Sequence, residues 1–179
     1  MPIQKFDPFE DRLSRDIRNT LSKSLMKALD SRDLAIVEKT AGIYLHQDIP
    51  APYLGYIRDR LERYRMSLDT IRQKKLTDPF TEALALWDNH LFFEVHERLE
   101  KIWMTAEGDQ KKALQAMIRA AGFYIHLAHG NTKAAHSMAD KAASALNLWG
   151  RALPNFTALN TLVKKLHTHD PVPPELLNS

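Results

Sequence analysis

Apolar residues recur at steps of three and four along nearly the whole chain, which is the spacing of an α-helix with one buried face. No segment alternates apolar and polar residues as a β-strand would, and only six glycines interrupt the pattern. The pattern therefore predicts an all-α protein, a helical bundle of about seven to eight helices. It is most regular in the stretch Leu54, Ile57, Leu61, Tyr64, Leu68 and Ile71.

Three helices are expected before residue 75. Asp7 and Pro8, with Glu10 completing a capping box, predict a first helix that carries Phe9 in its apolar stripe and ends near Leu29. Asp30 or Ser31 is expected to cap a second helix, which the segment 46–52 terminates. The third helix contains the stripe given above.

The second part of the chain repeats the same start signal at Asp78 and Pro79, which predicts a short helix that breaks at 88–90. A longer helix should then run to Gly108, which is expected to take the left-handed position at its end. Three further helices are expected at about 110–128, from Asn131 or Thr132 to Trp149, and around 156–166.

These elements suggest three segments. Residues 1–77 form an N-terminal helical region, residues 78–170 form a helical bundle, and residues 171–179 form a tail that we expect to be loosely attached. The formal net charge of +3 comes from residues 1–75, which hold 15 Lys and Arg against 11 Asp and Glu. Such an excess is usually a solvated helix face, so nucleic acid is not the expected partner.

Composition narrows the setting. The chain has no cysteine, which excludes disulfides, thiolate metal ligands and a cysteine nucleophile and fits a reducing compartment. Residues 1–10 lack the pattern of a signal peptide, and no stretch approaches the roughly 20 apolar residues of a membrane-spanning helix. We therefore expect a cytoplasmic protein without a membrane segment.

The candidate chemistry lies in the stretch 92–103, where His96 and Glu100 fall one helical turn apart beside the main apolar face. The next helix has a matching polar stripe. If the two helices pack antiparallel, the stripes could meet as a polar seam, in which Arg119 pairs with Glu100 and Gly122 permits close approach. The predicted seam consists of His96, Glu97 and Glu100 on one helix and Gln115, Arg119 and His126 on the other.

The same residues are also compatible with a structural role. Glu94 and Arg98, and likewise Glu97 and Lys101, have the spacing of ordinary i,i+4 pairs on a solvated face. Histidines on such stripes are also commonly satisfied within a core. A structural seam is therefore the simpler interpretation, and a ligand or catalytic site is the alternative.

A divalent transition metal is one candidate ligand, because imidazole and carboxylate together suit Zn, Mn or Fe. His96, Glu100 and His126 are the candidate metal ligands. The spacing matches neither the His-Glu-x-x-His run of zinc peptidases nor a di-iron bundle. No phosphate-binding loop or dinucleotide fingerprint occurs either, so those routes to nucleotide chemistry are not expected.

Two motifs resemble the domain of unknown function 309 family, over about residues 80–149. The run Phe93–Glu100 with Trp103 resembles the family's Glu-x-His-Glu-x-x-Glu-x-x-Trp signature, and Leu114–Ile118, continuing to His126 and Gly130–Asn131, resembles its second helix and turn. The resemblance implies an all-helical bundle and no established activity. The positions that match the family pattern are Glu94, His96, Glu97, Glu100, Trp103, Gln115, His126 and Asn131.

Two functions remain open. The first is a binding or interaction module, in which the seam organises a groove for an unknown protein partner or a small ligand. The alternative is a metal-assisted or acid/base hydrolase that uses His96, Glu97, Glu100 and His126, with Arg119 holding an anionic substrate. Self-association as a homo-oligomer is also compatible with the alanine-rich and heptad-like faces.

Overall fold

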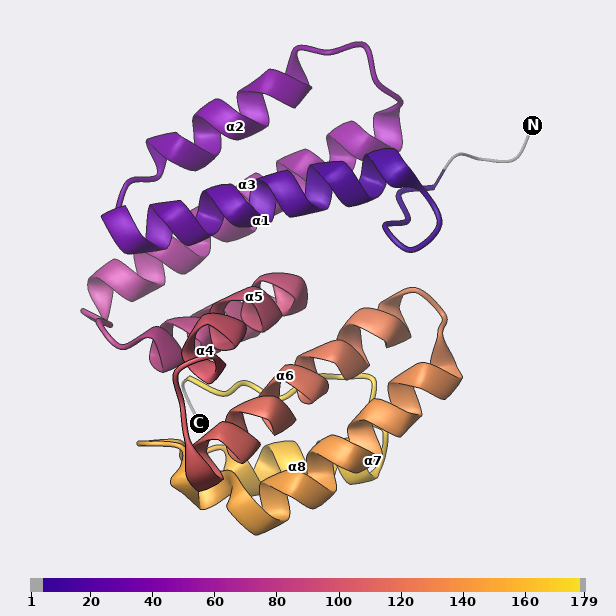
Figure 1. Cartoon of the computed structure of the whole chain (residues 1–179). Coiled ribbons are helices and arrows are strands. Elements are labelled where there is room, and N and C mark those ends of the chain that lie inside the picture. The colour runs from indigo at the N-terminus through magenta and orange to yellow at the C-terminus, as the bar shows by residue number, and fades with distance from the viewer. Residues whose placement is uncertain (1–4, 178–179) are drawn as a thin grey trace. The chain divides into compact units, whose positions relative to one another are not determined.

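The structure is a computed structural model and describes residues 5–177. This part of the chain folds into eight α-helices and one short 3₁₀ turn without any strand, which confirms the predicted all-α class (Figure 1). The chain divides into two compact units, residues 1–74 and residues 75–179. No helix in the described range is long and apolar enough to cross a membrane.

The first unit consists of α1 (Arg12–Ser31), α2 (Ala35–Leu45) and α3 (Ala51–Gln73), and each of these helices packs against the other two. Their apolar stripes supply the buried side chains, as the spacing predicted. Among the residues that are fully buried or nearly so are Ile17, Leu21, Leu25, Val37, Ala41, Ile57 and Tyr64.

The starts of the first two helices differ from the prediction. Asp7 opens a turn, in which the Asp11 N–H donates to the Asp7 carbonyl at 2.8 Å, and Phe9 stays 37% exposed. Helix α1 begins only after Asp11, because the Asp11 carboxylate accepts the Ser14 N–H at 2.7 Å and so caps the helix. Ser31 still belongs to α1, so neither it nor Asp30 caps α2. Asp33 instead accepts the Ala35 N–H, at 2.9 Å.

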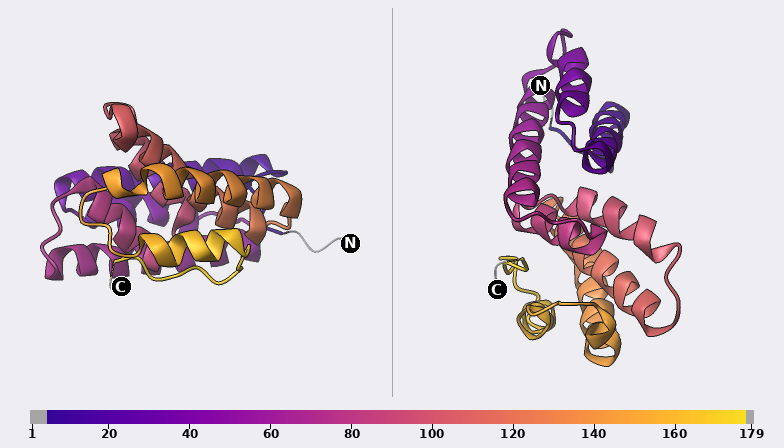
Figure 2. Two further views of the ribbon diagram at one scale, coloured as in Figure 1. Left: turned by 90° about the horizontal axis from the view of Figure 1, so that it is seen from below. Right: turned by 90° about the vertical axis from the view of Figure 1, so that its left-hand side faces the viewer.

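The second unit consists of α4 (Pro79–Asp88), α5 (Phe92–Trp103), α6 (Gly108–Ala128), α7 (Thr132–Trp149), a 3₁₀ turn (Gly150–Ala152) and α8 (Leu159–His167). The predicted cap of α4 is confirmed, because the Asp78 carboxylate accepts the Thr81 N–H at 3.0 Å. Helix α5 packs against both α4 and α6, α6 packs along α7, and α8 runs beside α7 (Figure 2, left).

Two glycines act differently from the prediction. Helix α5 ends at Trp103, and Gly108, with φ +57°, is the first residue of α6 instead of the end of α5. Gly122 faces α7, because a Cβ atom there would lie 2.7 Å from the sulfur of Met138. The small residue thus allows α6 and α7 to approach, whereas the prediction assigned it to the seam with α5.

The segment after α8 is anchored, although the sequence led us to expect a loosely attached tail. The indole N–H of Trp87 donates to the Pro174 carbonyl at 2.9 Å, and the Asp88 carboxylate accepts the N–H groups of Leu176 at 2.7 Å and Leu177 at 3.0 Å. The yellow trace in Figure 1 follows this path from α8 back towards α4. The last two residues of the predicted tail, 178 and 179, lie outside the described range, as do residues 1–4 of the segment tested for a signal peptide.

Candidate functional site

Helix α5 carries polar residues on two of its faces. Glu94 and Arg98 lie on the face that also buries Val95 and Leu99, so their side chains enter the core of the second unit. One step around the helix, His96, Glu97 and Glu100 lie on a face that is half-buried to exposed. The helical period alone separates these two sets, because residues four apart share a face.

The buried face holds an ion pair that links α5 to α4. The Arg98 guanidinium donates from Nε to Oε2 of Glu82 at 3.0 Å and makes a second hydrogen bond to the same oxygen from Nη2. Arg98 is 6% exposed, and Glu82 is 1% exposed. The i,i+4 interpretation placed Arg98 on a solvated face. The side chain is instead buried and joins two helices through a charge-assisted contact.

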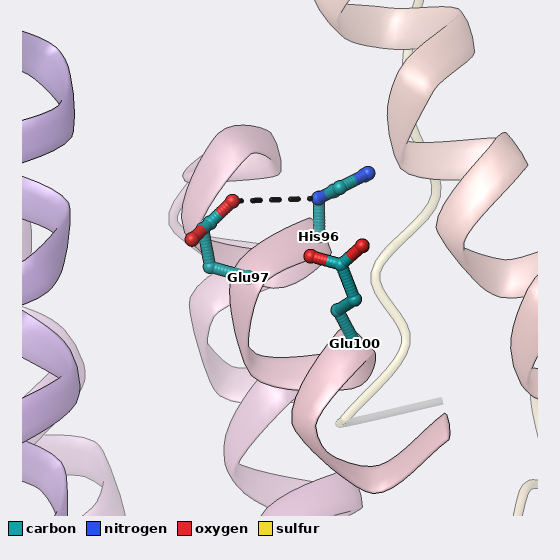
Figure 3. Close-up of side chains that lie close together, drawn as sticks. All are labelled: His96, Glu97 and Glu100. Atoms are coloured by element: carbon teal, nitrogen blue, oxygen red, sulfur yellow. Dashed lines mark ion pairs between the residues drawn. The ribbon is translucent and has the colours of Figure 1, made fainter. Parts of the chain in front are cut away.

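The other face brings three potential metal ligands together. One ligand atom from each of His96, Glu97 and Glu100 lies within 4.8 Å of the other two (Figure 3). His96 Nδ1 lies 3.6 Å from Glu97 Oε1, which is longer than a hydrogen bond, and the two side chains are each 33% exposed. We call these three residues the α5 cluster. The Nδ1 atom of His96 is buried and has no hydrogen-bond partner in the described part of the chain.

In the part of the chain that the structure describes, no lysine or arginine pairs with the carboxylates of the α5 cluster. Within residues 5–177, the contact between Glu97 and His96 is the one ion pair that either carboxylate makes, and the expected pair between Glu97 and Lys101 does not form. The predicted pair between Arg119 and Glu100 does not form either. The cluster thus keeps up to two negative charges that no cationic side chain of the described chain neutralises.

The remaining predicted seam residues lie on α6, at the end of α5 and just before α7. Gln115, Arg119 and His126 are all half-buried on α6. His126 was predicted as a metal ligand with His96 and Glu100, but the third potential ligand beside those two residues is Glu97. Burial lowers the pKa of His126 below its usual value. Trp103 lies beneath the Lys111 ammonium, 4.9 Å from the ring centroid, and Asn131 is exposed just before α7.

The sequence was compared with models of known protein families. Residues 80–138 match the family model described as Domain of unknown function (DUF309). This segment is a DUF309 domain. The match confirms the resemblance inferred from the two motifs, and it covers α4, α5, α6 and the first part of α7. No curated protein and no solved structure matches the chain.

Both polar faces of α5 lie within the DUF309 domain. Glu82, which pairs with Arg98 on the buried face, was not predicted from the sequence. Glu82 reads as an ordinary acidic residue in the first turn of α4. The signal that could have identified it is the apolar run Ala83–Trp87, because a helix that is apolar on all sides is buried and would bury Glu82 with it. A buried carboxylate requires a cation, and Arg98 is that cation.

Tyr124 of the DUF309 domain was also not predicted. Its side chain stacks on Phe92 with ring centroids 4.9 Å apart and meets the edge of Trp87 at 5.4 Å. The hydroxyl is buried and has no hydrogen-bond partner in the described chain. Burial raises the pKa of Tyr124, and the nearby charge of Asp170 adds to the effect, so the hydroxyl stays protonated at neutral pH.

Proposed function

We propose that the DUF309 domain is a binding module and that the α5 cluster recognises a positively charged group on a protein partner. One observation carries this proposal. The carboxylates of Glu97 and Glu100 lie within 4.8 Å of the His96 ring and have no lysine or arginine partner within the described residues. An arginine or lysine of a partner would supply the charge that the chain itself does not provide.

The surroundings of the cluster support recognition of a cation more than a purely structural role. A side chain that is one-third exposed can be reached from solvent, yet it is dry enough for a charge-assisted hydrogen bond to be stronger than at a fully exposed position. The neighbouring Arg98–Glu82 pair holds α5 against α4, so the cluster is presented on a fixed helix. Pre-organised acceptors of this kind lower the entropic cost of binding.

Metal-assisted hydrolysis is the second candidate, and a specific observation favours it as well. The imidazole and two carboxylates of the α5 cluster are a donor set that suits Zn, Mn or Fe, and their atoms are close enough to share one ion. In this case His96 and Glu100 would hold the ion, and the carboxylate of Glu97 beside them would be the acid/base group. Arg119, which forms no ion pair within residues 5–177, could hold an anionic substrate.

The first proposal is tested with an array of peptides that each contain one arginine or lysine at a fixed position in an otherwise randomised sequence. Wild-type protein should retain a subset of these peptides. The Glu97→Gln/Glu100→Gln chain should bind that subset at least about tenfold more weakly, because it lacks both carboxylates. The matched control is Glu107→Gln/Glu175→Gln, which removes two exposed carboxylates outside the cluster. Equal weakening by both double variants would reject the cluster as the binding site.

The second candidate is tested with protein purified without chelators. Metal analysis and the thermal shift caused by Mn²⁺, Fe²⁺ or Zn²⁺ are measured for the wild type and for His96→Ala. A bound metal that is lost in His96→Ala, together with turnover in a hydrolase panel that disappears in the same folded variant, would favour the enzyme. Absence of both bound metal and thermal shift would reject it.

A further inference from the structure

The C-terminal segment 171–177 lies on the second unit much as a bound peptide would. It has no helix, and it contains three prolines, at positions 171, 173 and 174. Proline fixes its own φ angle and favours an extended chain, so such a segment loses little freedom when it binds. We call this segment the C-terminal strap.

The strap is recognised through its main chain. The Pro174 carbonyl accepts the indole N–H of Trp87, and the N–H groups of Leu176 and Leu177 both donate to the Asp88 carboxylate. Trp87 and Asp88 are neighbours at the C-terminal end of α4, so one short stretch of helix supplies both the donor and the double acceptor. Peptide-binding surfaces commonly use main-chain hydrogen bonds in this way and add side-chain pockets for specificity.

Two side chains of the strap supply the specificity. Leu176 is 1% exposed, and Pro174 is also buried, whereas Val172 is 62% exposed and Glu175 points to solvent. The contact is therefore small and made at two positions separated by one exposed residue. A contact of this size can be exchanged for an equivalent one without dismantling the helices beneath it.

We propose that Trp87 and Asp88 form a docking site for an extended, proline-containing segment of a partner protein that has proline and leucine two positions apart, as Pro174 and Leu176 are, and that the C-terminal strap occupies this site as an internal ligand. The partner's segment displaces the strap and takes over its three main-chain hydrogen bonds. This site is separate from the α5 cluster, and the inference does not depend on the function proposed for that cluster.

The test uses the full chain with Leu176→Asp, which removes the buried anchor of the strap, and a synthetic peptide with the sequence of residues 170–177. Calorimetry should show that the peptide binds this variant at least about tenfold more tightly than it binds the wild type, where the tethered strap competes at a high effective concentration. Adding Trp87→Phe should weaken binding about fivefold, because the indole donor is lost. Trp149→Phe is the matched control and should change nothing.

A milder variant covers the case in which Leu176→Asp fails to fold. Asp88→Asn keeps the leucine buried but weakens the double acceptor, so hydrogen exchange at the amides of Leu176 and Leu177 should become faster while α5, α6 and α7 stay protected. Unfolding of the helices in both variants would show that the strap belongs to the core and would overturn the proposal. A folded Leu176→Asp chain that does not bind the peptide would also overturn the proposal. So would exchange of straps between two copies, seen as a dimer by light scattering, since the occupant would then be a second copy of the chain.

Discussion

The two polar faces of α5 hold carboxylates in opposite circumstances. On the buried face, Arg98 donates two hydrogen bonds to Glu82 of the neighbouring helix α4, and both side chains are almost completely removed from solvent. On the other face, Glu97 is partly exposed and Glu100 is exposed, and within residues 5–177 their one ion-pair partner is the imidazole of His96. One face of α5 therefore contacts a carboxylate of α4 that Arg98 neutralises, and the other face carries two carboxylates that no lysine or arginine of the described chain neutralises.

This difference shows that the fold requires a cation beside a buried carboxylate but permits exposed carboxylates without one. A buried carboxylate without a cation would cost several kcal/mol of stability, about 3–5 by the effect of breaking buried pairs, so the fold must supply Arg98. Exposed carboxylates are solvated and impose no such requirement. The carboxylates of the α5 cluster have no cationic side chain beside them in the described chain, and they lie next to the buried ring nitrogen of His96. A ligand could supply the missing positive charge, so the proposed function is assigned to this face of α5.

The largest effect is expected from Arg98→Met, which removes the cation from the buried face and leaves Glu82 unpaired. The free energy of unfolding should fall by about 3–5 kcal/mol, measured by urea denaturation with circular dichroism. Adding Glu82→Gln should recover much of this loss, because the remaining buried group is then neutral. The matched control is Arg63→Met, which breaks an exposed pair with Asp59 and should cost about 0–1 kcal/mol. Similar losses in the two single variants would contradict the comparison.

The second effect concerns the uncompensated face. Glu97→Gln/Glu100→Gln should change the free energy of unfolding by no more than about 0.5 kcal/mol, because no lysine or arginine contact is lost. The same variant should nevertheless lose the binding of cationic peptides described above. Urea denaturation of this variant beside the wild type measures the stability. A loss of more than about 2 kcal/mol would show that the cluster is structural after all.

How far the sequence predicts this arrangement depends on the range of the interaction. Helical periodicity gave the all-α class, and the Asp78-Pro79 signal gave the start of α4, because both depend on residues that are close in sequence. The same kind of signal at Asp7 misplaced the start of α1. The competing cap at Asp11 is also held by the hydroxyl of Tyr53, 42 positions away, at 2.9 Å.

The candidate site shows the same limit. The three members of the α5 cluster lie within one turn and a half of helix, so their proximity follows from the sequence. Arg98 has Glu94 one helical turn before it, but its hydrogen bonds to Glu82 reach another helix, which no i,i+4 rule could identify. The strap contacts join residues nearly 90 positions apart and were missed for the same reason.

A third prediction supplies the exposed face with the cation that it lacks. Met104 is 70% exposed and follows Glu100 by four residues, so Met104→Lys places an ammonium within reach of that carboxylate. The free energy of unfolding should rise by about 0.3–0.5 kcal/mol. Binding of cationic peptides should weaken at low salt, because the new lysine competes for Glu100. Met66→Lys, at another exposed methionine, is the control. Stronger peptide binding in Met104→Lys would exclude Glu100 from the site.

The smallest expected effect comes from His126, the histidine that the structure separates from the α5 cluster. Burial lowers its pKa in the folded protein, so below the unfolded value near 6.5 the unfolded chain binds the proton more readily than the folded one. Its contribution to stability is therefore complete above that value and declines as the pH falls through it. The urea midpoint should drop between about pH 7.5 and about pH 5.5, and it should drop less in His126→Gln than in the wild type. The exposed His167→Gln should behave like the wild type. A pH dependence that His126→Gln leaves unchanged would mean that other groups control it and that His126 is not desolvated enough to matter.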